Sequence, residues 1–392
     1  MVNFEYYAPT KVVFGKNSEA KVGELIKEQG CTKVLVHFGG ESAKKSGLLD
    51  RIFESLKACN IDFVTLGGVV PNPRLSKVYE GIELCRKENV DFILAVGGGS
   101  VIDSSKAIGY GLKYDGDVWD LYAKKAKASG CIPIGAVLTI AAAGSEMSDS
   151  SVITNEDGWI KCGYSSNYCR CKFAILNPEL TYSLPAFQTA CGSVDILMHT
   201  MERYFTKEKD TQLTDELAEG LMRTVIAASK VLVKNPTDYN ARAQIMWASS
   251  LSHNDLTGCG TVGDWACHLL GHELSGLFDK AHGAALSSLW CSWARYVYKT
   301  DAARFAQFAV KVMGVTPQAN DEETALLGIS EMEKFYHEIN MPANLRELGL
   351  EVSEELIDKL ATRCSFNGNR TIGVFKQLAH DDIHKIYSMA GN

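Results

Sequence analysis

The segment that decides the fold is Asp91–Ser100, with the sequence DFILAVGGGS. Its start is a nearly continuous apolar run, which is typical of a parallel strand covered by helices on both faces. Three glycines and a serine follow directly, and a helical pattern begins after them. Backbone N–H groups and the helix dipole favour an anion at such a turn, although a tight turn alone would also explain the glycines. The turn is neither a Gly-x-Gly-x-x-Gly motif nor a Walker loop.

The segments around this turn alternate between strand and helix patterns. Strands are predicted at 33–38, 62–66 and 132–138, helices at 48–59 and 76–88, and shorter strands at 152–153, 159–164 and 172–176, of which some could form a hairpin. Such alternation predicts a parallel α/β sheet. After Pro185 the strand signals nearly vanish, and helical patterns cover 186–205, 211–234, 239–256, 262–277, 284–299 and 322–339. We therefore predict an α/β domain over 1–184 and an all-helical domain over 185–392.

The composition narrows the class of protein. Of 392 residues, 46% are hydrophobic and 22% charged, so disorder is excluded as the general state. The net charge of −7 argues against a nucleic acid partner. Twelve scattered cysteines without a Cys-x-x-Cys pair indicate reduced thiols. The start has no apolar signal-peptide core, and the longest uncharged run, 128–145, is too short and polar to span a bilayer, so we expect a cytoplasmic protein without a membrane partner.

Histidines and an aspartate in the second half are the candidate metal ligands. Asp195 and His199 lie four residues apart, as do His268 and His272, so each pair shares a helical face, and His282 follows at a glycine-containing break. A carboxylate with two or three histidines suits a divalent metal such as Fe2+ or Zn2+. The same residues could instead be hydrogen-bonded polar residues of the core, and spacing alone leaves both interpretations open. In His380–His384 (HDDIH) the acid pair is better explained as a helix cap than as a metal site.

Seven ordered segments along essentially the whole chain together resemble the iron-containing (group III) alcohol dehydrogenase family. They are YAPTKVVFG at 7–15, VVPNP at 69–73, GGGSVID at 97–103, AGSEMS at 143–148, Asp195-x-x-x-His199, His268-x-x-x-His272 and His282. The segment 39–47, GGESAKKSG, is similar to the branch of NADPH-dependent butanol dehydrogenases and aldehyde reductases. The resemblance implies a Rossmann-like dinucleotide-binding α/β domain followed by an all-helical metal-binding domain, with the active site in the cleft between them.

The resemblance also assigns residues to roles. It implies that one metal ion is held by Asp195, His199, His268 and His282. His272 would lie beside the metal and serve as a catalytic proton relay. The cofactor would be bound by Gly97, Gly98, Gly99 and Ser100 at its pyrophosphate, by Asp103, Thr139 and Lys161 near the nicotinamide and its ribose, and by Asn72 on the adenine side. Gly39, Gly40 and Ser42, with Lys44 and Lys45 nearby, favour the extra phosphate of NADP(H).

Two departures from the family pattern bear on the cofactor. Glu41 replaces a third glycine and would repel the phosphate of NADP, which leaves NAD(H) as the alternative. The segment 138–143, LTIAAA, replaces a threonine-rich run, so some hydroxyl contacts to the cofactor would be missing.

We expect a homodimeric enzyme that reversibly reduces a small aliphatic aldehyde such as butanal, with NADP(H) as the favoured cofactor and a Lewis-acid metal. One alternative is a polyol dehydrogenase of the same superfamily, acting on glycerol or propanediol. A second is a cyclase or lyase resembling dehydroquinate synthase, for which a basic substrate cleft would be expected. A third is a nucleotide-binding protein without catalytic activity, in which the aspartate and histidines would be core polar residues.

Overall fold

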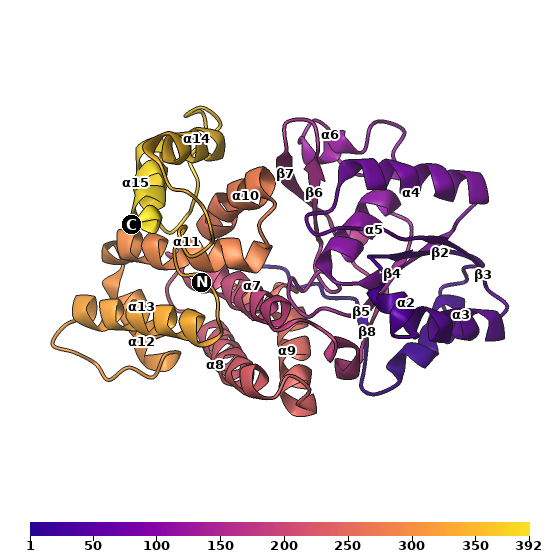
Figure 1. Ribbon diagram of the computed structural model, residues 1–392, viewed down its shortest axis with the longest axis horizontal. Helices are drawn as coiled ribbons and strands as arrows, with labels where there is room; N and C mark the ends of the chain where they lie inside the picture. The colour runs from indigo at the N-terminus through magenta and orange to yellow at the C-terminus, as the bar shows by residue number, and fades with distance from the viewer. The chain divides into compact units, whose positions relative to one another are not determined.

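The computed structural model describes residues 1–392, and the chain forms two compact units (Figure 1). The α/β unit contains Tyr7–Leu184 and Ser249–Asn254, and the helical unit contains Met1–Tyr6, Pro185–Ala248 and Asp255–Asn392. The main division lies between Leu184 and Pro185, where the strand patterns end. Two short segments depart from the division expected from the sequence, because Met1–Tyr6 packs with the helical unit and Ser249–Asn254 with the α/β unit.

A six-stranded parallel sheet forms the centre of the α/β unit. Its strands, in spatial order, are β1 (Lys11–Phe14), β8 (Phe173–Leu176), β5 (Ile134–Leu138), β4 (Phe92–Gly97), β2 (Lys33–Phe38) and β3 (Asp62–Leu66). All neighbouring strands run parallel. Every residue of β4 and β5 is buried, which confirms the prediction of a parallel sheet covered on both faces. A separate antiparallel hairpin joins β6 (Ser150–Asn155) to β7 (Ile160–Ser165).

Helices cover both faces of this sheet (Figure 1). They are α1 (Val22–Lys27), α2 (Ser42–Lys45), α3 (Leu48–Ala58), α4 (Leu75–Glu88) and α5 (Gly99–Gly111), whereas α6 (Trp119–Tyr122) packs against the hairpin strand β7. On one face, Ile52 and Leu56 of α3 pack with Leu94 of β4 in a common core. On the other face, α5 packs against β4 and the hairpin. Helix α5, which follows the glycine turn, therefore packs between β4 and the hairpin, and this packing fixes the position of its N-terminus.

Nine helices build the helical unit (Figure 1). They are α7 (Ala186–Tyr204), α8 (Gln212–Lys234), α9 (Tyr239–Ser252, whose last residues belong to the α/β unit), α10 (Ala266–Phe278), α11 (His282–Val297), α12 (Ala302–Lys311), α13 (Asp321–Glu338), α14 (Glu354–Cys364) and α15 (His380–Gly391). Helix α10 begins four residues later than predicted, because Trp265 has a left-handed backbone (φ 63°) that ends the preceding irregular segment. Phe205 packs against Phe305 and Trp293 in the aromatic core of the unit.

Single-turn 3₁₀ helices at Ser18–Lys21, Asn167–Cys169, Pro178–Thr181, Leu256–Gly258 and Tyr298–Thr300 complete the elements. None of the helices combines the length and the apolar character that a membrane span requires.

Candidate active site

The glycine turn between β4 and α5 has the geometry of an anion site. Gly97 ends the strand, Gly98 is the N-cap, and Gly99 and Ser100 form the first turn of a 13-residue helix. A Cβ at Gly97 would lie 2.4 Å from a Val101 methyl, and one at Gly98 would lie 2.8 Å from Ile140 Cβ. Only glycine fits this close packing, so the turn presents bare backbone at a helix N-terminus. Such a terminus binds a pyrophosphate readily.

Asp103, one turn into α5, holds the loop that follows β5. Its Oδ1 accepts a hydrogen bond from the Ser145 hydroxyl, and its Oδ2 accepts one from Val152 N at 3.0 Å. Lys106, which is fully buried, donates to the carbonyls of Ser145 and Ser150 at 2.7 and 2.8 Å. Burial raises the pKa of Asp103, and the charge of Lys106 opposes this shift. Two charged residues of α5 therefore fix this loop beside the glycine turn.

Two further cofactor candidates contact each other directly. Lys161 Nζ on β7 donates to Asn72 Oδ1 at 3.0 Å, and Asn72 is 6% exposed with a left-handed backbone. Arg74 donates to the Asn72 carbonyl at 2.9 Å and lies 4.8 Å from the centre of the Trp159 ring. These contacts bind the Asn72 loop to the hairpin. Thr139 lies closer to the glycine turn, since its N–H donates to Gly97 O at 3.0 Å.

The turn after β2 has open space. Gly39 O accepts a hydrogen bond from Gly68 N at 2.7 Å, whereas a Cβ at Gly40 would meet nothing within 4 Å. Glu41 precedes the short helix α2, which begins at Ser42. Glu41, Ser42, Lys44 and Lys45 are all exposed. The turn therefore combines room for a phosphate with two cations and one opposing carboxylate.

Three histidines of the helical unit surround one carboxylate oxygen. The distances to Asp195 Oδ1 are 3.6 Å from His199 Nδ1, 3.8 Å from His268 Nε2 and 3.7 Å from His282 Nε2. The ligand atoms of Asp195, His268 and His282 all lie within 4.8 Å of one another. His199 lies outside that trio but stacks on His268, with 4.7 Å between the ring centroids. Three helices, α7, α10 and α11, thus bring the four predicted metal ligands together.

The donor set fits a divalent metal ion. Asp195 and His268 are 4% and 6% exposed, and Asp195 Oδ1 and His268 Nε2 have no hydrogen-bond partner. Buried polar atoms in this state are costly. An ion about 2.1 Å from nitrogen and oxygen donors would satisfy both atoms, and Fe2+ and Zn2+ both accept these ligands.

Glu202 is a site residue that the sequence analysis missed. Its Oε1 accepts hydrogen bonds from both the backbone N and the ring Nδ1 of His268, each at 2.9 Å. Burial lowers the pKa of His268, but the carboxylates of Asp195 and Glu202 outweigh burial and raise it overall. The signal in the sequence is that Glu202 follows Asp195 by seven residues, which places it on the same face of α7.

Asp264 and Trp265, just before α10, were not predicted as site residues. Asp264 Oδ1 accepts hydrogen bonds from Val374 N and Phe375 N at 2.6 and 2.7 Å. Burial, with the charge of Glu202, raises the pKa of Asp264 to about 7. The Trp265 ring packs edge-on to His268, with centroids 5.3 Å apart. Trp265 thus packs beside His268, and Asp264 links the start of α10 to the segment at 374–375.

His272 and His384 are the remaining histidine candidates. His272 is one helical turn beyond His268, and its ring centroid is 5.7 Å from that of His282. His384 pairs with Glu354 at 3.1 Å. Asp382 Oδ2 accepts a hydrogen bond from Ala379 N at 2.9 Å, which confirms that this acid caps α15.

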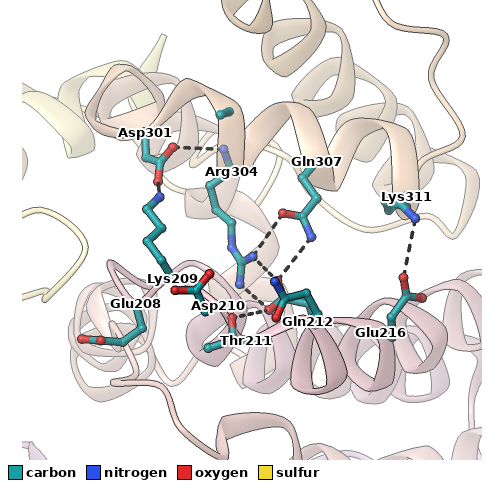
Figure 2. Close-up of a pocket in the computed structure, with 12 residues that line it drawn as sticks. Glu208, Lys209, Asp210, Thr211, Gln212, Glu216, Asp301, Arg304, Gln307 and Lys311 are labelled. Atoms are coloured by element: carbon teal, nitrogen blue, oxygen red, sulfur yellow. Dashed lines mark hydrogen bonds and ion pairs between the residues drawn. The ribbon is translucent and has the colours of Figure 1, made fainter. Parts of the chain in front are cut away.

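A polar hollow between α8 and α12 contains charged groups that are paired with one another (Figure 2). Arg304 forms a two-pronged pair with Asp215, at 2.5 and 2.7 Å. Lys209 pairs with Asp301, and Lys311 lies 3.5 Å from Glu216. Because each cation has its own carboxylate, this hollow offers no unpartnered cation to a ligand.

Comparisons with known proteins cover both units. A model described as iron-containing alcohol dehydrogenase matches residues 9–178. A model described as Fe-containing alcohol dehydrogenase family, C-terminal, matches residues 189–391. The chain is 39% identical to NADH-dependent butanol dehydrogenase A of Clostridium acetobutylicum, with 99% of each chain covered. It is 34% identical to an NADPH-dependent aldehyde reductase of Escherichia coli K12, over the whole of both chains.

A solved structure agrees with these relatives. The crystal structure of NADH-dependent butanol dehydrogenase A from Thermotoga maritima is 38% identical to the chain, with a TM-score of 0.95 and coverage of 100% of this chain and 99% of that one. The cluster of Asp195 and the histidines in the helical unit and the glycine turn in the α/β unit thus occur in a chain that matches one family over most of its length. The protein belongs to the iron-containing alcohol dehydrogenase family.

Proposed function

We propose that the protein catalyses the reversible reduction of a small aliphatic aldehyde, such as butanal, to the primary alcohol, with a nicotinamide nucleotide as the hydride carrier. As a member of this family, the protein is an NAD(P)H-linked oxidoreductase of alcohols and aldehydes. The observation that carries the proposal is the convergence of three imidazole nitrogens on the buried Asp195 Oδ1, at 3.6 to 3.8 Å.

Asp195, His199, His268 and His282 would hold one Fe2+ or Zn2+ ion. When bound, such an ion supplies Lewis acidity toward a carbonyl or alkoxide oxygen. The carboxylate of Asp195 reduces the net charge of the site, while three neutral imidazoles complete it. Asp195, His199 and His268 are buried, whereas the His282 side chain is 23% exposed. Burial of the first three limits their contact with bulk water and strengthens electrostatic interactions within the site.

The α/β unit would bind the nucleotide. The N-terminus of α5, with Gly97, Gly98, Gly99 and Ser100, would hold the pyrophosphate. Asp103, Thr139 and Lys161 would contact the nicotinamide side, and Asn72 the adenine side. Lys161 Nζ donates to Asn72 Oδ1 at 3.0 Å, so these two residues would contact adjoining parts of the nucleotide rather than its opposite ends.

The preferred nucleotide in this proposal is NADP(H). Gly40, between Gly39 and Ser42, leaves room for the 2′-phosphate, because a Cβ there would meet nothing within 4 Å. The exposed Lys44 and Lys45 supply positive charge. The opposing carboxylate of Glu41 is exposed and can turn toward solvent, where water screens its charge.

His272 is the proposed proton relay. An imidazole exchanges protons near neutral pH more readily than any other side chain. Its ring centroid lies 5.7 Å from that of His282, which places His272 beside the proposed ligands.

We also propose a cytoplasmic homodimer. All twelve cysteines are unbridged, which fits a reducing compartment. Strand β1 lies at the edge of the sheet and pairs only with β8, so its outer edge is available for pairing with a second copy. Sedimentation equilibrium tests this part, and a monomer at micromolar concentration would contradict it.

Initial rates with butanal test the function. Protein reconstituted with Fe2+ or Zn2+ is expected to oxidise NADPH, and to do so faster than NADH. A faster rate with NADH would overturn the cofactor preference and leave the chemistry intact. A higher rate with glycerol or propane-1,3-diol in the oxidative direction would reassign the substrate class. Full activity in a metal-free His268→Ala protein would refute the metal mechanism.

A further inference from the structure

Glu202 lies on the same face of α7 as Asp195 and His199, two of the proposed metal ligands. The spacing of four and then three residues aligns these side chains along one side of the helix. Glu202 is only 3% exposed, so its carboxylate has lost most of its contact with water. A buried carboxylate requires strong hydrogen-bond donors, and both donors come from His268.

The ring contact determines which nitrogen of His268 carries the proton. Glu202 Oε1 lies 2.9 Å from Nδ1, and an ionised carboxylate can only accept a hydrogen bond. A lone pair on Nδ1 would face that oxygen and be repelled. The Nδ1–H tautomer is therefore favoured, which leaves the lone pair on Nε2, 3.8 Å from Asp195 Oδ1.

The same glutamate also fixes the backbone that carries the ring. The His268 N–H donates to Glu202 Oε1, and Asp264 N donates to the Glu202 carbonyl at 2.7 Å. Two hydrogen bonds thus attach the start of α10 to the end of α7. Since α7 also carries Asp195, the distance between the two proposed ligands depends on Glu202.

We propose that Glu202 is a positioning residue, which fixes the tautomer and the orientation of His268 so that Nε2 is the metal-binding nitrogen. The inference rests on the proposed metal centre. Partners that hold the second nitrogen of a ligating histidine also make the ring a stronger ligand, and their loss typically weakens metal binding 10- to 100-fold.

The test compares Glu202→Ala and Glu202→Gln with a matched control, Glu219→Gln. Glu219 on α8 is 1% exposed and accepts a hydrogen bond from the Tyr204 hydroxyl at 2.9 Å, so it is an equally buried carboxylate outside the site. Dissociation constants for Co2+ and Zn2+ are measured by chelator competition. We expect Glu202→Ala to weaken binding about 10- to 100-fold. Glu202→Gln should keep much of the wild-type metal affinity, because the amide oxygen can still accept both hydrogen bonds. Glu219→Gln should bind metal like the wild type.

A second readout is ¹⁵N–¹H correlation spectroscopy of the zinc-loaded protein labelled at histidine, with His268 assigned by substitution. The wild type should show a proton on Nδ1 of His268. A proton on Nε2, or wild-type metal affinity in Glu202→Ala, would overturn the inference. The spectrum of the wild type decides the question even if Glu202→Ala does not fold. Failure of the proposed function gives a different result, in which the wild type itself binds neither metal tightly.

Discussion

Replacing Gly283 with alanine tests how far the metal site depends on the contact between α7 and α11. Gly283 follows His282 directly, and an added Cβ would lie 2.2 Å from the Cys191 carbonyl oxygen and 2.7 Å from Cys191 Cα. An ordinary van der Waals contact begins near 3.4 Å. The first turn of α11 must therefore move away from α7 by about 1.2 Å to accommodate the added Cβ. The obstructing atoms belong to the backbone of α7 and cannot rotate away.

A displacement of this size exceeds the tolerance of a metal site. Ligand distances in such sites vary by only about 0.2 Å, whereas His282 would move away from Asp195 by about 1 Å. We expect Gly283→Ala to bind Zn2+ at least about tenfold more weakly, as happens when ligand orientation is lost. Overpacking should also reduce the free energy of unfolding by about 1–3 kcal/mol.

The assays are chelator competition for Zn2+ and urea unfolding, with Gly271→Ala as the control. Gly271 lies on α10 between His268 and His272, but the nearest atom to its added Cβ would be Leu286 Cδ2, at 3.0 Å, and the next atoms would lie at 3.8 and 3.9 Å. This contact is short by only about 0.4 Å, against about 1.2 Å at Gly283, so Gly271→Ala should keep the wild-type zinc affinity within about threefold. Wild-type affinity and stability in Gly283→Ala would refute the reasoning, because the close approach of the two helices would then not constrain His282.

Three further substitutions give independent checks. Glu41→Gly should raise kcat/KM for NADPH about fivefold with little change for NADH, since repulsion between an exposed charge and the 2′-phosphate costs about 1 kcal/mol. An unchanged ratio of kcat/KM for NADPH to kcat/KM for NADH would place Glu41 away from that phosphate. His272→Gln should lower kcat about 100-fold while the metal content stays at the wild-type level, as expected for a lost proton relay, and loss of metal would make His272 a ligand instead. Burial lowers the pKa of His37 to about 4, so the folded protein holds this ring neutral and loses stability as the pH falls from about 6.5 toward 4. Urea unfolding should show a loss of about 2 kcal/mol between pH 7 and 5 from this group, and His37→Gln should lack that component.

The sequence predicts the sheet well because its decisive signals are local. The apolar run before the glycine turn becomes β4, with every residue buried. Three further short strand patterns left the pairing open. Those at 152–153 and 159–164 form the hairpin of β6 and β7, whereas the one at 172–176 becomes β8 of the main sheet. In contrast, nothing in the composition of Ser249–Asn254 indicates that it packs with the α/β unit, where the Ser250 hydroxyl donates to Glu146 at 2.6 Å. Contacts between distant segments leave no periodic signal.

The same distinction explains which site residues the sequence could supply. Asp195 and His199 share a helical face, so their spacing alone predicts that they lie together. Glu202 shares that face too, but a glutamate in a helix is usually solvated, and only the contact with His268 shows its role.

Convergence of the ligands depends on packing between helices rather than on spacing within them. His282 reaches the Asp195 oxygen from α11, and no pattern within one helix can set that 3.7 Å distance. The neighbouring Gly283 makes this distance possible. Because Gly283 has no side chain, α11 packs against the backbone of Cys191, which lies one turn before Asp195 on α7. A histidine–glycine pair at the start of a helix thus provides both a donor atom and the close approach that brings this atom to the carboxylate.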